Sequence, residues 1–115
     1  MVHAAHASAY HWSLVGTVVN RVRSEWQCSR VYAVLGRAEP ALHHARRCLE
    51  LAESAPSELE EFDLPFAFEA MARAHSVAGD DAHAREWLAR ASAAGEEIGD
   101  EDDRVLLAAD LATIG

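Results

Sequence analysis

The sequence contains no lysine, and ten arginines face nineteen acidic residues, so the formal net charge is −9. Proteins that bind nucleic acid in general need a basic surface that neutralises phosphates. We therefore expect no nucleic-acid partner. Residues 1–47 hold six of the arginines and only two acidic residues, Glu25 and Glu39. Acidic residues thus concentrate in the later part of the chain, where a solvated surface is the simplest interpretation.

Cysteine and long apolar runs are also scarce. Cys28 and Cys48 form no CxxC pair, and two cysteines do not make a disulfide framework. Both lie in apolar helical stretches, so we expect them to be reduced core residues. No apolar run approaches the eighteen or so residues that span a membrane, and no secretory signal pattern is visible. We expect a cytoplasmic protein without a membrane partner.

Motifs of the common enzyme classes are missing. The chain has no GxSxG, no P-loop and no dinucleotide-binding glycine pattern. Glu25, Glu69 and His75 are residue types that can transfer protons, but residue type without geometry is weak evidence for catalysis. We expect no catalytic activity and no cofactor.

Helix signals, by contrast, fill the sequence. Alanine is the most frequent residue, and alanine and arginine both favour helix. Apolar residues recur at spacings of three and four, and Gly36 and Gly79 stand where helices should end. We predict one all-α domain over residues 1–115. Its expected helix pairs span about residues 17–54 and 64–98, with flanking helices at 2–15 and 101–114.

The two predicted pairs share a sequence pattern at a shift of 43 residues, which places Gly36 over Gly79 and Ala41 over Ala84. A glycine at the turn between two helices, followed five residues later by alanine, resembles the tetratricopeptide repeat. The resemblance covers about residues 23–54 and 66–97. It implies a short α-solenoid of antiparallel helix pairs, although the period exceeds the roughly 34 residues usual in that family. A helical bundle without repeats is the alternative.

Two stretches extend this resemblance. SEWQCSRVYAVLGRAEPALHHARRCLE and FDLPFAFEAMARAH are similar to segments of a group of small uncharacterised bacterial proteins with the same helical arrangement. That similarity supports the fold and implies no activity.

The tetratricopeptide resemblance also implies a binding surface, because the first helix of each pair lines the concave face in that family. The candidate groove residues are Arg23, Trp26, Arg30, Phe66, Glu69 and Arg73. Arginine forks and aromatic faces suit a carboxylate. We therefore expect a module that binds a protein or peptide through an acidic group or a free carboxylate. The competing interpretation pairs Glu69 with Arg73 one turn away and puts Trp26 and Phe66 in the core.

Seven histidines suggest a second function class, a helical protein that binds a small ligand or a metal through His and Glu side chains. His3 and His6 are one helical turn apart, and His11 follows on the same predicted helix. No HExxH motif or cysteine accompanies them, so solvent-facing histidines are the simpler interpretation. A closed polar pocket that gathers His6, His11, Glu25 or Glu69 would favour this class.

Self-association is the last expectation. A stack of two helix pairs leaves apolar faces uncovered at both ends. The predicted terminal helices supply such faces with Tyr10, Trp12, Leu14, Val105, Leu106, Leu111 and Ile114. We predict a homodimer that covers them; the alternative is a single chain whose terminal helices cover each other.

Overall fold

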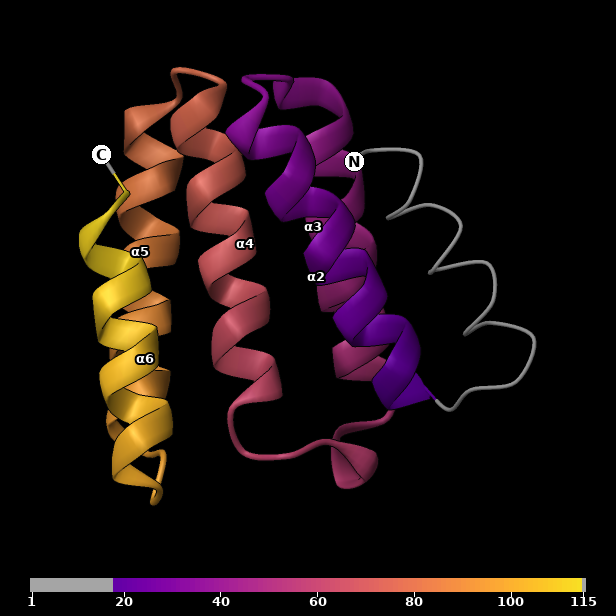
Figure 1. Ribbon diagram of the computed structural model, residues 1–115, viewed down its shortest axis with the longest axis vertical. Helices are drawn as coiled ribbons and strands as arrows, with labels where there is room; N and C mark the ends of the chain where they lie inside the picture. The colour runs from indigo at the N-terminus through magenta and orange to yellow at the C-terminus, as the bar shows by residue number, and fades with distance from the viewer. Residues whose placement is uncertain (1–17, 115) are drawn as a thin grey trace.

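The computed structural model describes residues 18–114, and all regular elements in that range are helical. The predicted all-α class is therefore confirmed for these residues. None of the described helices has both the length and the apolar character needed to cross a membrane. The helix expected at residues 2–15, with His3, His6 and His11, lies outside the described residues. The elements are α2 (Val18–Val34), α3 (Ala38–Ser54), the 3-10 turn η1 (Pro56–Glu58), α4 (Asp63–Val77), α5 (Asp81–Glu96) and α6 (Glu101–Ala112) (Figure 1).

Two tight turns with the same backbone geometry reverse the chain after α2 and after α4. Gly36 and Gly79 have φ of 73° and 78°, a left-handed conformation that glycine adopts without steric cost. The amide of Arg37 donates to the carbonyl of Tyr32 over 2.9 Å, and the amide of Asp80 donates to that of His75 over 2.9 Å. These bonds satisfy carbonyls at the helix ends. As a result α3 folds back along α2, and α5 folds back along α4 (Figure 1).

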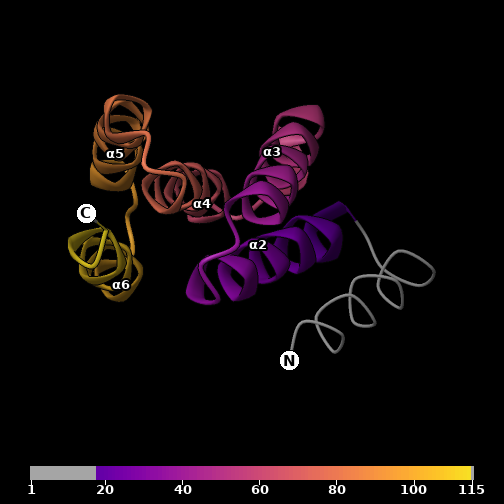
Figure 2. The same ribbon diagram turned by 90° about the horizontal axis from the view of Figure 1, so that it is seen from above.

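The helices form two rows when seen from above (Figure 2). α3 and α5 lie on one side, α2 and α6 lie on the other, and α4 stands between them. Besides its contacts with α5, α4 packs against both α2 and α3, and α6 packs against α5 and α4. α4 is therefore the central helix of the described structure.

The core consists largely of small side chains. Ala41, Ala45 and Ala74 are completely buried in one cluster that also contains Tyr32 and Met71. Side chains this small allow neighbouring helices to approach closely. The larger side chains of Leu49 and Leu88 are only partly buried.

Both cysteines lie in the interior, as the sequence suggests. Cys28 and Cys48 are free thiols with no exposed surface. The Cys48 thiol donates a hydrogen bond of 3.3 Å to the carbonyl of Val22. Burial, with a smaller effect from the negative charge of Glu25, raises the pKa of Cys28 to about 11 and that of Cys48 still further.

Candidate functional site

The six predicted groove residues lie along the seam between α2 and α4. On each helix, spacings of three and four residues place three side chains on one face. The side chains come from Arg23, Trp26 and Arg30 on α2 and from Phe66, Glu69 and Arg73 on α4. Trp26 and Phe66 pack edge to face, with ring centroids 5.9 Å apart.

Glu69 is the centre of this seam, and its side chain is only 1% exposed. Oε2 accepts a hydrogen bond of 2.9 Å from the indole of Trp26. Oε1 accepts bonds from Arg73 at 2.8 Å and from Arg30 at 3.4 Å. Burying an isolated carboxylate would destabilise the protein by several kcal/mol. Two guanidinium groups and an indole compensate the buried charge of Glu69. The main role of Glu69 is therefore structural: it holds α2 and α4 together.

The two arginines at Glu69 also reach α6. Nη2 of Arg73 donates to the carbonyl of Asp110 over 3.0 Å and to the hydroxyl of Thr113 over 2.8 Å. Nη1 of Arg30 lies 3.7 Å from a carboxylate oxygen of Asp110. Cationic side chains suit the carbonyl-rich end of a helix. One charged network thus joins the inner faces of α2, α4 and α6.

Arg23 belongs to a separate ion pair nearer η1. Its Nε and Nη2 donate to the two carboxylate oxygens of Asp63 over 3.0 and 3.1 Å, and its guanidinium lies 5.1 Å from the ring centroid of Phe62. Asp63 also accepts from the amide of Glu60 over 2.9 Å. Arg30 and Arg73 therefore meet at Glu69, whereas Arg23 has its own carboxylate. None of these three arginines is left without an acidic partner inside the chain.

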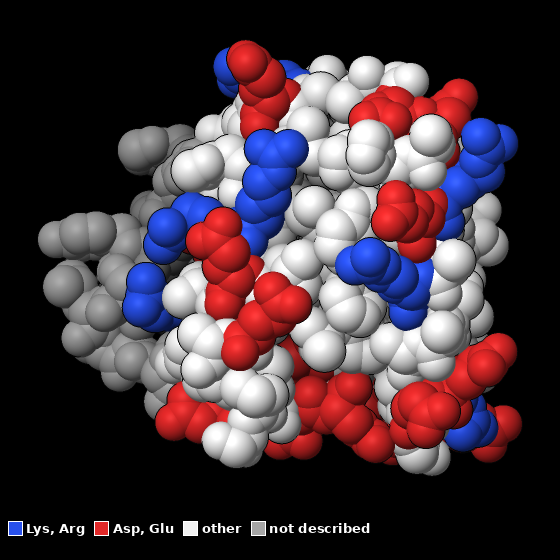
Figure 3. Space-filling model, turned by 180° about the vertical axis from the view of Figure 1, so that it is seen from behind, with Lys and Arg blue, Asp and Glu red and all other residues white. Residues whose placement is uncertain are grey.

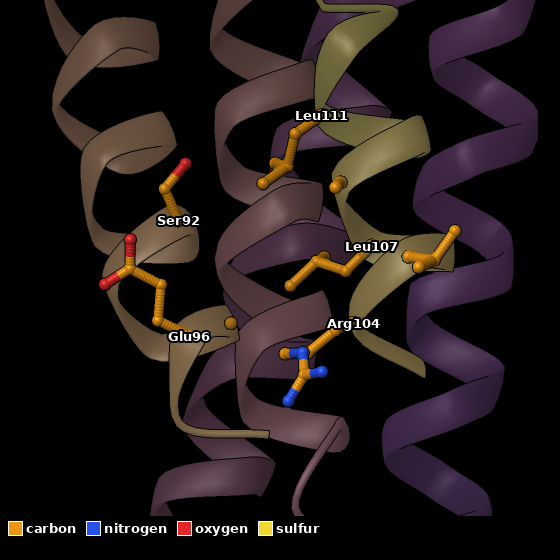
Figure 4. A pocket seen from close by; sticks show the side chains of 8 residues that line it. Ser92, Glu96, Arg104, Leu107 and Leu111 are labelled. Atoms are coloured by element: carbon orange, nitrogen blue, oxygen red, sulfur yellow. The ribbon is translucent and has the colours of Figure 1, made fainter. Parts of the chain in front are cut away.

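A second feature is an open groove of about 440 Å³ between α5 and α6. Leu107 and Leu111 lie on its α6 side, and Ser92 and Glu96 lie on its α5 side (Figure 4). Gly95 allows the two helices to approach, because a Cβ at this position would lie 2.7 Å from Cδ2 of Leu107. The remaining lining residues are Arg104, Val105 and Ala108.

α6 is poorly covered on its apolar side. Leu107 is its only buried residue, while Val105 and Leu106 are 61% and 55% exposed. α2 and α4 are each followed by a helix that packs along them. Within residues 18–114, α6 has no such following helix. The sequence identified the apolar residues of α6, but not the groove that they form with α5.

Acidic side chains gather at one end of the molecule, along the lower edge of Figure 3, where the η1 connection and the α5–α6 turn lie. Glu61 stabilises this end, since its carboxylate accepts from the amides of Gly99 and Asp100 over 3.1 and 3.3 Å. Loss of hydration, together with the charges of Asp100 and Glu61, raises the pKa of Asp103. Exposed acids of this region are Glu58, Glu60, Glu61, Glu96, Glu97, Asp100, Glu101 and Asp102. Arg104 also lines the groove, and its Nη1 donates to the carbonyl of Ile98 in this turn over 3.0 Å, but the acidic side chains outnumber it, so this end of the groove is negative.

The described residues also contain one cluster that has the composition of a metal site, formed by His75, Asp80 and His83 at the α4–α5 turn. The three potential ligand atoms lie within 4.8 Å of one another. Sequence reasoning missed it, because these residues become neighbours only through the reversal at Gly79.

The sequence also suggested a closed polar pocket of His and Glu side chains. Two of its candidate members, Glu25 and Glu69, are among the described residues, and each contacts other partners. Glu25 accepts from Nδ1 of His44 over 2.7 Å and lies 3.6 Å from Nε of Arg47. Glu69 is committed to the α2–α4 seam. Each carboxylate therefore has its own basic partners.

These features make three candidate sites: the α2–α4 seam, the α5–α6 groove and the α4–α5 turn. In the seam every charged group named above has an internal partner, whereas the groove presents apolar side chains to solvent and the turn presents three potential ligands. Comparisons with family models, curated proteins and solved structures find no match to this chain.

Proposed function

We propose that the chain is a protein-binding module without catalytic activity, built as a short tetratricopeptide-like α-solenoid, and that it receives an amphipathic helix of a partner protein in the groove between α5 and α6. The observation that carries the proposal is the uncovered apolar face of α6 beside that groove.

Three features support the solenoid arrangement. The α2–α3 and α4–α5 turns have the same left-handed glycine and the same closing hydrogen bond. Trp26 and Glu69, which contact each other, are separated by the 43 residues that separate the two glycines. In Figure 2, α2 and α6 lie on one side of the stack, α3 and α5 lie on the other, and α4 stands between them. In such an array each helix pair covers an apolar face of the next.

α3 packs along α2, and α5 packs along α4. A bound helix would take the corresponding place beside α6. Helix-in-groove recognition uses apolar anchors at spacings of three and four residues, and Val105, Ala108 and Leu111, spaced three residues apart, present a matching surface on α6. Each Å² of apolar surface that such a helix removes from water contributes about 25 cal/mol. Apolar contact therefore provides the affinity.

The charge around the α5–α6 groove determines which kind of helix binds there. The acidic end of the groove, with Glu96, Glu97 and Glu101 exposed, attracts a helix whose apolar stripe is flanked by lysine or arginine. A second copy of this chain, with net charge −9, would bring more negative charge to the same place. We therefore favour a basic partner helix, and the homodimer predicted from the sequence becomes the competing occupant. This partner chemistry replaces the acidic ligand expected from the sequence, because the seam arginines already pair with Glu69 and Asp63.

The test uses two synthetic 18-residue helical peptides with the same leucine stripe, one flanked by lysines and one by glutamates, each fluorescently labelled. Anisotropy titration should show binding of the lysine peptide and, because of the acidic groove end, at least tenfold weaker binding of the glutamate peptide, or about 1.4 kcal/mol. Equal affinity for both peptides, or no binding of either, would refute the proposal.

Two neighbouring residues on α6 provide a matched pair of variants. Val105 lines the groove and Leu106 does not, although the two have similar exposure. Val105→Asp should weaken binding of the lysine peptide about tenfold or more, and Leu106→Asp should leave it unchanged. Sedimentation equilibrium completes the test. If the wild type is a dimer and only Val105→Asp makes it a monomer, a second copy of the chain, and not a basic partner helix, occupies the groove.

A further inference from the structure

The α4–α5 turn directs two histidines toward one carboxylate oxygen. Nδ1 of His83 lies 2.6 Å from Oδ2 of Asp80, and Nδ1 of His75 lies 3.7 Å from the same oxygen. The two imidazole rings stack with their centroids 5.2 Å apart and an interplanar angle of 24°. Three side chains with metal-binding atoms therefore converge from the end of α4, the turn and the start of α5.

Helix ends hold all three residues in place. His75 lies in the last turn of α4, and its side chain is 11% exposed. Asp80 is the N-cap of α5, where its Oδ1 accepts from the amide of His83 over 3.2 Å. The His83 side chain is 59% exposed, so less packing restrains its ring than that of His75. The arrangement combines a fixed imidazole, a fixed carboxylate and an adjustable second imidazole at the surface.

The corresponding turn between α2 and α3 shows that this backbone geometry does not require the side chains of His75, Asp80 and His83. A shift of 43 residues places His75, Asp80 and His83 over Tyr32, Arg37 and Pro40. The α2–α3 turn closes with the same hydrogen bond and the same left-handed glycine, while Arg37 stacks over the Tyr32 ring at 5.6 Å. Closure of the turn therefore does not require the two histidines, and the N-cap role of Asp80 does not account for them either.

We propose that His75, Asp80 and His83 bind a divalent transition-metal ion such as Zn²⁺ through the two Nδ1 atoms and the Asp80 carboxylate. Zinc–ligand distances of about 2.0–2.2 Å place tetrahedral ligand atoms about 3.3 Å apart. The separations of 2.6 and 3.7 Å to Asp80 lie on either side of that value, and all three ligand atoms lie within 4.8 Å of one another, so metal binding requires only small movements of these side chains. Two imidazoles select zinc, nickel or copper over magnesium and calcium. Three protein ligands leave a coordination position for water or for a donor from another molecule.

The binding assay is isothermal titration of the full, EDTA-treated chain with ZnCl₂. His3, His6 and His11 near the N-terminus are further potential ligands, so the titration is repeated on a variant in which all three are alanine. We expect that variant to keep one bound Zn²⁺ per chain. In the same background, His83→Ala should lower the affinity at least about tenfold, since loss even of an outer-shell partner costs 10–100-fold.

Two further variants separate metal binding from folding. Asp80→Asn retains an N-cap acceptor but loses the carboxylate charge, so we expect weaker Zn²⁺ binding with unchanged helix content by circular dichroism. His43→Ala removes an exposed histidine of α3 outside the cluster and should bind Zn²⁺ as before. The proposal is overturned if the chain binds no Zn²⁺, if the triple variant loses binding, or if His83→Ala and Asp80→Asn bind like the wild type. None of these outcomes depends on peptide binding in the α5–α6 groove.

Discussion

The indole nitrogen of Trp26 donates a 2.9 Å hydrogen bond to the carboxylate of Glu69, a residue 43 positions further along the chain. Gly36 and Gly79, which reverse the chain after α2 and after α4, are separated by the same number of residues. Residues at corresponding positions of the two helix pairs therefore touch directly across the α2–α4 seam. Glu69 is also hydrogen-bonded to Arg30 and Arg73. The Trp26–Glu69 contact therefore belongs to the same charged network that reaches α6.

Replacing Glu69 by glutamine should destabilise the protein by about 2 kcal/mol. The amide keeps an acceptor for Trp26, but Arg30 and Arg73 lose the carboxylate that compensates their charge. Removing one member of a fully buried pair costs about 3–5 kcal/mol, and the partial exposure of Arg30 lowers the expected value. Urea denaturation measures the effect. Glu86→Gln is the matched control, since Glu86 and Arg90 form an exposed pair that contributes at most about 1 kcal/mol. Equal stability losses in the two variants would contradict the structural role of Glu69.

Leu107→Ala should release α6 while α2 to α5 stay folded. Leu107 is 1% exposed and is the only buried residue of α6, so its truncation removes most of the apolar contact that holds this helix. We expect a loss of about 2 kcal/mol, at the low end for a buried leucine because the groove beside it is open. Hydrogen exchange should accelerate in α6 and not in α2 or α3. Leu106→Ala, at an exposed site on the same helix, serves as the control. Uniform acceleration in all helices after Leu107→Ala would show that α6 does not open separately.

Stability should fall in acid partly through Glu25. Burial alone would raise the pKa of Glu25, but the hydrogen bond from His44 and the charges of His44 and Arg47 outweigh it, so the pKa is lowered from its ordinary value of 4.5. A carboxyl group whose pKa is lower in the folded state stabilises the protein above the unfolded pKa, and this contribution is lost as the pH falls through the folded value. Urea titrations at pH 7, 4.5 and 3.5 should therefore show a smaller acid-induced loss for Glu25→Gln than for the wild type. Identical losses would exclude a contribution from this pair.

Both thiols should resist labelling in the native protein. Cys28 and Cys48 have no exposed surface, and burial raises the pKa of Cys28 to about 11 and that of Cys48 further, so neither forms the reactive thiolate at neutral pH. A thiol reagent such as DTNB at pH 8 should react slowly with the folded chain and rapidly in concentrated urea. Fast reaction of one equivalent without urea would mean that one cysteine becomes accessible in the native state.

Several local features were predictable from residue type and spacing. Glycine is the residue that readily takes positive φ, so Gly36 and Gly79 marked the two turns. Spacings of three and four residues brought Trp26 and Arg30 to one face of α2, because that spacing follows from helical geometry alone. The apolar surroundings of Cys28 and Cys48 in the sequence likewise indicated burial.

Relations between helices were not predictable in this way, because they depend on how closely two helix axes approach and on the rotation of each helix about its axis. The tetratricopeptide resemblance placed Arg23, Arg30 and Arg73 in a groove, whereas these arginines pair with Glu69 and Asp63 in the structure. His75, Asp80 and His83 became a cluster only when the chain reversed at Gly79.

The sequence by itself determined the helical class and the positions of the two glycine turns, since both follow from interactions within a few residues. Only the tertiary structure decided which charges neutralise each other, which ligands converge and which face of α6 remains open. Those outcomes depend on distances between side chains on different helices. Across α2 and α4, for example, packing places the Trp26 nitrogen 2.9 Å from Glu69, and no local pattern specifies that distance.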